Sequence, residues 1–146
     1  MGGHDSYGKG MLKRVLGARF DNWADSRKVK FGDIAVSLDG VITAAGSYEV
    51  VCAVEVEAEN EKQVRSAVLN LFLHPAPRAL LILMPVNLSN PLPKVLEHIQ
   101  ALWGRLTGGK RGELPVVCLL GDGNNPAVGE DEAQLRIELQ GLGITV

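Results

Sequence analysis

The sequence is poor in the residue types that mark several classes of protein. Its 146 residues include two cysteines and three histidines, and aromatic residues make up 5%. Cys52 and Cys118 both lie in apolar runs, so we expect two buried thiols in a cytoplasmic protein and no disulfide framework. His74 and His98 have no partner at the spacing of zinc ligands, and few aromatic side chains are present to stack on exposed bases.

Long apolar runs are also missing. The longest candidate, ALLILMPV, is far shorter than the roughly 18 residues that a membrane-spanning helix requires, and it contains a proline. We therefore expect no membrane span. The first ten residues, MGGHDSYGKG, have no apolar core of a signal peptide. We expect a flexible N-terminal tail over residues 1–10 and a single α/β domain over residues 11–146.

The charge is unevenly distributed, although the overall composition is that of a folded protein. Hydrophobic residues make up 46% of the chain and charged residues 22%, which excludes a disordered chain. The net charge is −2, but residues 1–30 hold seven Lys or Arg against three acids. This basic segment indicates either a contact with DNA through an N-terminal helix or an ordinary solvated helix face.

The apolar periodicity predicts alternating helices and strands. Helices are expected over residues 10–24, 61–73, 90–108 and 130–143, and strands over 31–38, 41–46, 48–58, 78–85, 114–120 and 144–146. Asp39-Gly40 predicts a hairpin turn between the first two strands, and Asn60 with Gln63 predicts the cap of the second helix. The order α-β-β-β-α-β, followed by α-β-α-β, indicates an α/β fold bordering on α+β, with a mixed sheet flanked by helices.

Three glutamates alternate with apolar residues in the third predicted strand, VCAVEVEAEN. Glu55, Glu57 and Glu59 share one side of it, and consecutive members are about 6.5–7 Å apart. With Asp33, which opens the first predicted strand, Glu55 and Glu57 would form an oxygen-only site suited to Mg²⁺ or Mn²⁺. The alternative is that these acids form a solvated strand face.

The string GDIAV…AVEVEAENEKQ, in this order of elements, resembles the core of the restriction-endonuclease-like superfamily, the PD-(D/E)XK nucleases. The resemblance covers about residues 11–85. It implies that Asp33, Glu55 and Glu57 are catalytic and metal-binding residues of a Mg²⁺- or Mn²⁺-dependent endonuclease that hydrolyses DNA phosphodiesters. Glu57 stands where that family usually has Lys, and Gly32 stands where it has Pro. A nuclease this small is also expected to form a homodimer to cut two strands.

Two other functions are compatible with the sequence. The first is a catalytically inactive domain of the same fold that serves in binding or assembly, which the missing lysine favours. The second is an unrelated regulatory α/β domain, which would need the loop at Gly121-Asp122-Gly123 to bind phosphate. The convergence of Asp33, Glu55 and Glu57 in space distinguishes the nuclease from these alternatives.

Overall fold

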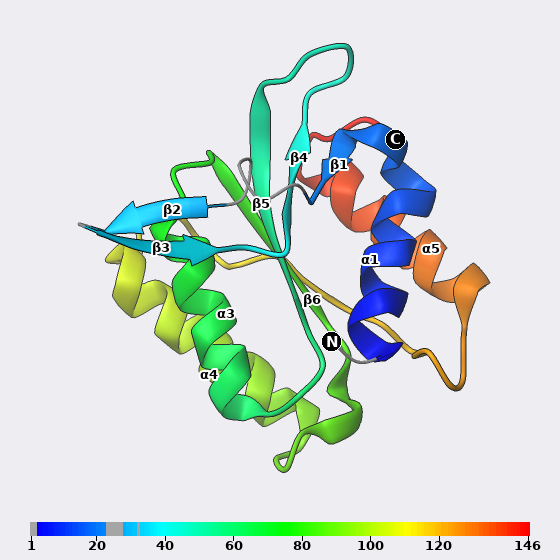
Figure 1. Ribbon diagram of the computed structural model, residues 1–146. Helices are drawn as coiled ribbons and strands as arrows, with labels where there is room; N and C mark the ends of the chain where they lie inside the picture. Colours follow the sequence, from blue (N-terminus) through cyan, green and yellow to red (C-terminus); the bar gives the residue numbers. More distant parts are fainter. Residues whose placement is uncertain (1–2, 23–27, 32) are drawn as a thin grey trace.

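The computed structural model describes residues 3–22, 28–31 and 33–146 of the protein. A five-stranded mixed sheet forms the centre of the molecule (Figure 1). Its strands, in spatial order, are β1 (Phe20–Asp21), β4 (Gly40–Thr43), β5 (Val50–Glu57), β6 (Arg78–Leu83) and β7 (Val116–Cys118). The pairs β1–β4 and β4–β5 are antiparallel, whereas β5–β6 and β6–β7 are parallel. The predicted mixed sheet of an α+β or α/β protein is therefore confirmed.

Helices cover both faces of this sheet. They are α1 (Gly3–Leu16), α3 (Glu61–Leu73), α4 (Leu92–Thr107) and α5 (Val128–Gly141), with short 3₁₀ turns at Gly17–Arg19 and Pro85–Asn87. One face packs against α1 and α5, and the other against α3 and α4 (Figure 1). Among the described residues, no helix is long and apolar enough to cross a lipid bilayer.

Alternation along β5 places its side chains in two separate cores. Cys52, Val54 and Val56 belong to the core under α1 and α5, and Ala53 belongs to the core under α3 and α4. Because strand side chains alternate, Glu55 and Glu57 point from the same side of β5 as Ala53. The acids of this strand therefore face the side of the sheet that α3 and α4 cover.

The helix that follows β5 begins and packs as its sequence predicts. The Asn60 side chain accepts a hydrogen bond from the Gln63 amide at 3.0 Å, which satisfies one of the donors left free at a helix start. Its predicted apolar stripe is buried, namely Val64, Ala67, Val68 and Leu71. At the end of α4, Gly108 has φ of 64°, a left-handed conformation that glycine adopts without a Cβ clash.

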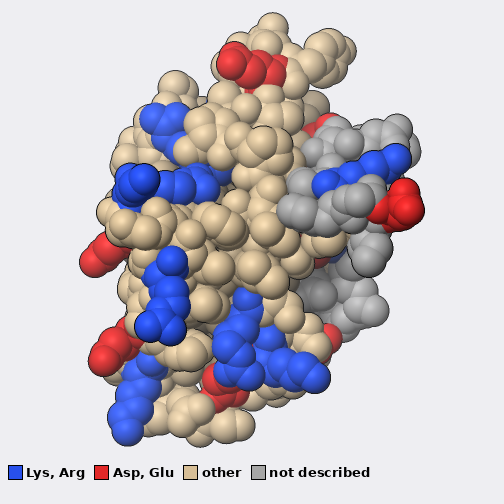
Figure 2. Space-filling model, turned by 90° about the vertical axis from the view of Figure 1, so that its left-hand side faces the viewer, with Lys and Arg blue, Asp and Glu red and all other residues tan. Residues whose placement is uncertain are grey.

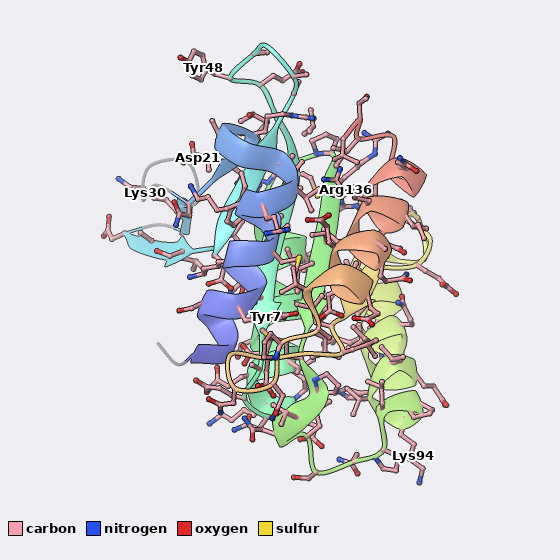
Figure 3. All side chains as sticks on the ribbon, turned by 90° about the vertical axis from the view of Figure 1, so that its right-hand side faces the viewer. Tyr7, Asp21, Lys30, Tyr48, Lys94 and Arg136 are labelled. Atoms are coloured by element: carbon pink, nitrogen blue, oxygen red, sulfur yellow. The ribbon has the colours of Figure 1, made fainter. Side chains whose placement is uncertain are left out.

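The N-terminus differs from the prediction, because α1 already begins at Gly3. The Tyr7 hydroxyl donates to the buried Asp131 carboxylate at 2.7 Å and accepts from the Ala127 amide at 3.1 Å. Gly8 lies so close to β5 that a Cβ there would approach Val56 Cγ1 to 2.6 Å. In place of the predicted flexible tail, residues 3–10 are helical, and Tyr7 and Gly8 pack against the loop before α5 and against the sheet (Figure 3).

The first predicted strand also has a different partner. The strand β3 (Ile34–Ser37) pairs with β2 (Lys28–Phe31) in a separate two-stranded sheet that projects from the body (Figure 1). Gly40 begins β4, so Asp39-Gly40 does not turn a hairpin back onto β3. The expected adjacency of residues 33–38 and 50–57 is wrong, and so is the expected strand over 144–146.

Candidate functional site

A pair of carboxyl groups lies where β4 begins beside β5. The antiparallel register joins Gly40 to Val54, which places the preceding residue, Asp39, opposite Glu55. The Asp39 amide donates to Glu55 Oε1 at 3.1 Å, and Asp39 Oδ2 accepts from the Val56 amide at 2.7 Å. The Asp39 side chain thus takes the place of a further β4 residue in the hydrogen-bond ladder, next to the Glu55 carboxyl group.

Glu55 is buried, with 7% of its surface exposed. Burial, together with the neighbouring charges of Asp39 and Glu57, raises the pKa of the Glu55 carboxyl group to about 9, against the lowering effects of the Asp39 amide and Lys9. Glu55 therefore carries a proton at neutral pH. The alternative interpretation of this strand as a solvated acidic face is wrong at Glu55, since a solvated carboxyl group would be exposed.

A cation from α1 completes the cluster. Lys9 Nζ lies 3.3 Å from Asp39 Oδ1, and the two side chains are only 12% and 22% exposed. Sequence reasoning missed Lys9 because it assigned residues 1–10 to a tail. The available signal for a helix there was the spacing of four residues that all face the core, Tyr7 with Met11 and Gly8 with Leu12.

The remaining predicted site residues lie in different surroundings. Glu57 is half-buried, and its Oε2 accepts from the amides of Ala58 and Glu59, so this carboxylate folds back onto the end of its own strand. Asp33 is exposed in the turn that joins β2 to β3. The structure therefore places Glu55 beside Asp39 and leaves the predicted ligand Asp33 on the projecting hairpin, so the expected convergence of Asp33, Glu55 and Glu57 is not found.

The donor atoms of this cluster suit a hard divalent cation, although they do not form a closed cage. Among the residues that the structure describes, no group of three or more His, Cys, Asp or Glu side chains converges closely enough to hold a metal ion. Mg²⁺ in proteins is commonly held by one or two carboxylates, with water and substrate phosphates completing its shell. Asp39 and Glu55 supply two such carboxyl groups, and Asp39 is partly accessible. A Mg²⁺ or Mn²⁺ ion placed there would need water or substrate oxygens for the rest of its coordination shell.

The glycine-rich loop after β7 has its amides already engaged. Asp131, 1% exposed, accepts from the amides of Leu120 and Gly121 at 2.7 and 3.0 Å. Asp122 Oδ1 accepts from the amides of Asn124 and Asn125 at 2.7 and 2.8 Å. Because protein carboxylates take these donors, the loop offers no ready cradle for a phosphate, which disfavours a nucleotide-binding regulatory domain.

The basic N-terminal segment is largely occupied by contacts within the protein. Arg14 pairs with Glu132 at 2.6 Å, Arg19 donates to the carbonyl groups of Thr43 and Thr145, and Lys13 lies 5.9 Å from the centre of the Phe20 ring. The side chains of Arg27 and Lys28 are outside the described part of the chain. These contacts give the segment a structural role in holding α1 to the body.

Asp39, Glu55 and Lys9 thus meet at one end of the sheet, from the start of β4, from β5 and from α1. Asp39 and Glu55 are neighbouring acids whose side chains have little exposed surface, a placement that functional carboxylates often share. Comparison with known proteins gives no further guide, since no protein-family model, no curated protein and no solved structure matches the chain.

Proposed function

We propose that the protein is a Mg²⁺- or Mn²⁺-dependent nuclease-like domain that hydrolyses DNA phosphodiesters, with Asp39 and Glu55 as its metal-binding residues. The observation that carries this proposal is the buried Glu55 carboxyl group, which lies beside Asp39. A buried acid beside a second acid destabilises the metal-free protein, and a divalent cation would compensate that cost.

The order of the main-sheet elements adds support. Leaving aside the projecting β2–β3 hairpin, the chain runs α1, β1, β4, β5, α3, β6, which is the α-β-β-β-α-β order of the restriction-endonuclease-like superfamily. In that comparison Asp39 replaces Asp33 as the acid of the first half of the motif, with Glu55 and Glu57 as its second half. Lys9 supplies, from α1, a cation that the strand lacks at Glu57.

Each residue of the cluster has a definable task. Lys9 holds Asp39 Oδ1, and the Val56 amide holds Asp39 Oδ2, so the carboxylate is oriented before any ligand arrives. Glu55 keeps a proton at neutral pH and must release it to become a ligand. A divalent cation bound there would polarise a phosphodiester and lower the pKa of a bound water.

A non-catalytic domain of the same fold is the second candidate, and one observation favours it. Lys9 already neutralises Asp39 at 3.3 Å, and such an ion pair could serve only to fasten α1 to the start of β4. In that case the cluster would stabilise the fold without binding a metal. DNA as the partner, a homodimer and a cytoplasmic location remain predictions under either candidate.

Nicking of supercoiled plasmid DNA tests the proposal. With millimolar Mn²⁺, the wild-type protein should convert the plasmid to open circles, and chelator should stop the reaction. Asp39→Asn should reduce the rate at least 100-fold, because the Asn side chain keeps the hydrogen bond from Val56 but lacks the charge.

The matched control for that substitution is Asp33→Asn, which makes the same chemical change on the projecting hairpin. It should retain the wild-type rate. The absence of nicking by a folded wild-type protein would exclude the nuclease, and equal loss in Asp33→Asn and Asp39→Asn would contradict the assignment of Asp39.

A further inference from the structure

The segment from Glu61 to Gly112 has a charge opposite to that of the whole protein. It contains seven Lys or Arg residues and two acids, whereas the chain as a whole has a net charge of −2. Figure 2 shows Lys and Arg side chains gathered on the side of the molecule where α3 and α4 lie. This face is therefore basic, in contrast to α5, whose first turn carries the exposed acid Glu130.

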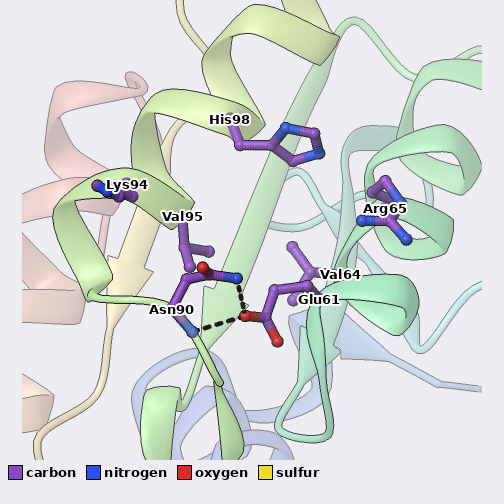
Figure 4. Close-up of a pocket in the computed structure, with 7 residues that line it drawn as sticks. All are labelled: Glu61, Val64, Arg65, Asn90, Lys94, Val95 and His98. Atoms are coloured by element: carbon purple, nitrogen blue, oxygen red, sulfur yellow. Dashed lines mark hydrogen bonds between the residues drawn. The ribbon is translucent and has the colours of Figure 1, made fainter.

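A groove of about 260 Å³ runs between α3 and α4 on this face. Val64 and Val95, both buried, form its floor. Arg65 comes from α3 on one side, and His98 comes from α4 on the other (Figure 4). Lys94, one helical turn before His98, also lines the groove. The groove thus combines a fixed apolar base with exposed nitrogen donors.

The cations of the groove have no acidic partner in Glu61, because its carboxylate binds other groups. Glu61 and Arg65 have the i, i+4 spacing at which helical ion pairs form. Glu61 instead accepts hydrogen bonds from the Ser89 amide and from the backbone and side-chain nitrogens of Asn90, at 2.6–3.2 Å (Figure 4). These bonds lower the pKa of Glu61 to about 2, so it stays ionised. Within the described ranges, neither Arg65 nor Lys94 has an acidic partner.

We propose that the groove between α3 and α4 binds the phosphate groups of a nucleic-acid backbone through Arg65 and Lys94. Exposed, unpaired cations along a groove favour a polyanion, because each phosphate contact also releases condensed counterions. The choice of nucleic acid over another polyanion rests on the proposed nuclease function. Glu61 begins α3 four residues after Glu57. A nucleic-acid strand held in the groove would therefore lie on the side of the sheet that Glu55 and Glu57 face.

Fluorescence anisotropy with a labelled DNA duplex, in chelator and over a range of salt concentrations, tests this assignment. The double variant Arg65→Ala/Lys94→Ala should weaken binding at least 10-fold at about 100 mM salt. It should also reduce the slope of log affinity against log salt by about 1.8, which corresponds to two lost phosphate contacts. Each single variant should reduce the slope by about 0.9, which corresponds to one lost phosphate contact.

The matched control is Arg136→Ala, which removes one positive charge from α5, away from the groove (Figure 3). It should leave both the affinity and the salt slope unchanged. Equal weakening by Arg136→Ala, no effect of the double variant, or equally tight binding of poly-glutamate would each overturn the assignment. Because binding is measured without metal and nicking requires Mn²⁺, failure of the groove and failure of the Asp39 site give different results.

Discussion

At the scale of single residues, Glu55 is the group whose surroundings differ most from those of an ordinary acid. A carboxyl group in water is ionised at neutral pH, but burial beside Asp39 and Glu57 raises the pKa of Glu55 to about 9. The folded protein therefore binds a proton more tightly than the unfolded chain between about pH 4.5 and pH 9. The contribution of Glu55 to stability is complete below the unfolded pKa and is lost as the pH rises towards 9.

Substitution of Glu55 by Gln should remove this pH dependence. Gln keeps an oxygen for the Asp39 amide but has no charge to bury, so the variant should be more stable than the wild type at pH 8 by several kcal/mol and equal to it near pH 4. Denaturant unfolding in chelator, from pH 4 to pH 9, measures the difference. The exposed Glu59→Gln serves as the control and should follow the wild type. A constant difference across this range would show that Glu55 does not hold a proton.

At the scale of elements, the sequence predicted helices and parallel strands better than it predicted the meander. Local signals decide the helices and parallel strands: Asn60 caps α3, Gly108 ends α4 and the apolar run of residues 79–83 lies in the interior strand β6. The pairing of short strands is a tertiary choice that alternation alone leaves open. Asp39-Gly40 reads locally as a hairpin turn, yet Gly40 starts β4, and a Cβ there would meet the Phe20 ring at 2.6 Å.

The pairing of β4 with β5 decides which acid lies beside Glu55, and this acid is Asp39 rather than the predicted Asp33. The register shift between Ile42 and Thr43 places Asp39 opposite Glu55, whereas the same register continued to Asp33 reaches Glu61, already in α3. The strand β5 and the position of Glu55 on it could be predicted from the sequence. Lys9 could not, because a polar, glycine-rich segment gives little sign of the tight packing that Gly8 permits.

Docking of α1 gives a prediction at this same scale. Tyr7→Phe removes a hydroxyl that donates to the buried Asp131 and accepts from the Ala127 amide. The variant should lose about 1–3 kcal/mol of unfolding free energy, since buried groups lose a partner. Urea unfolding measures the loss, and Tyr48→Phe, at an exposed tyrosine in the loop between β4 and β5 (Figure 3), is the control. Equal stability of Tyr7→Phe and the wild type would indicate that the N-terminal helix does not dock.

At the scale of the whole molecule, the carboxyl cluster and the basic groove are formed by consecutive parts of the chain. The acidic cluster is at the end of β5, and the basic groove follows directly in α3 and α4. A nuclease needs both, one part to hold the phosphate backbone and another to cut it. In the proposed function, DNA affinity would depend on Arg65 and Lys94, and metal dependence on Asp39 and Glu55.

The central claim is that Asp39 and Glu55 bind one divalent cation. The most direct measurement is the thermal midpoint in chelator and in Mn²⁺, at pH 6.5 and pH 8, for the wild type, Asp39→Asn and Asp33→Asn. Metal at about one hundred times its dissociation constant adds about 2.7 kcal/mol, so the wild-type midpoint should rise by several degrees. The rise should be larger at pH 8, since Glu55 must lose its proton. Asp33→Asn should behave as the wild type and Asp39→Asn should not respond. A wild-type midpoint that Mn²⁺ leaves unchanged at both pH values would contradict the metal site.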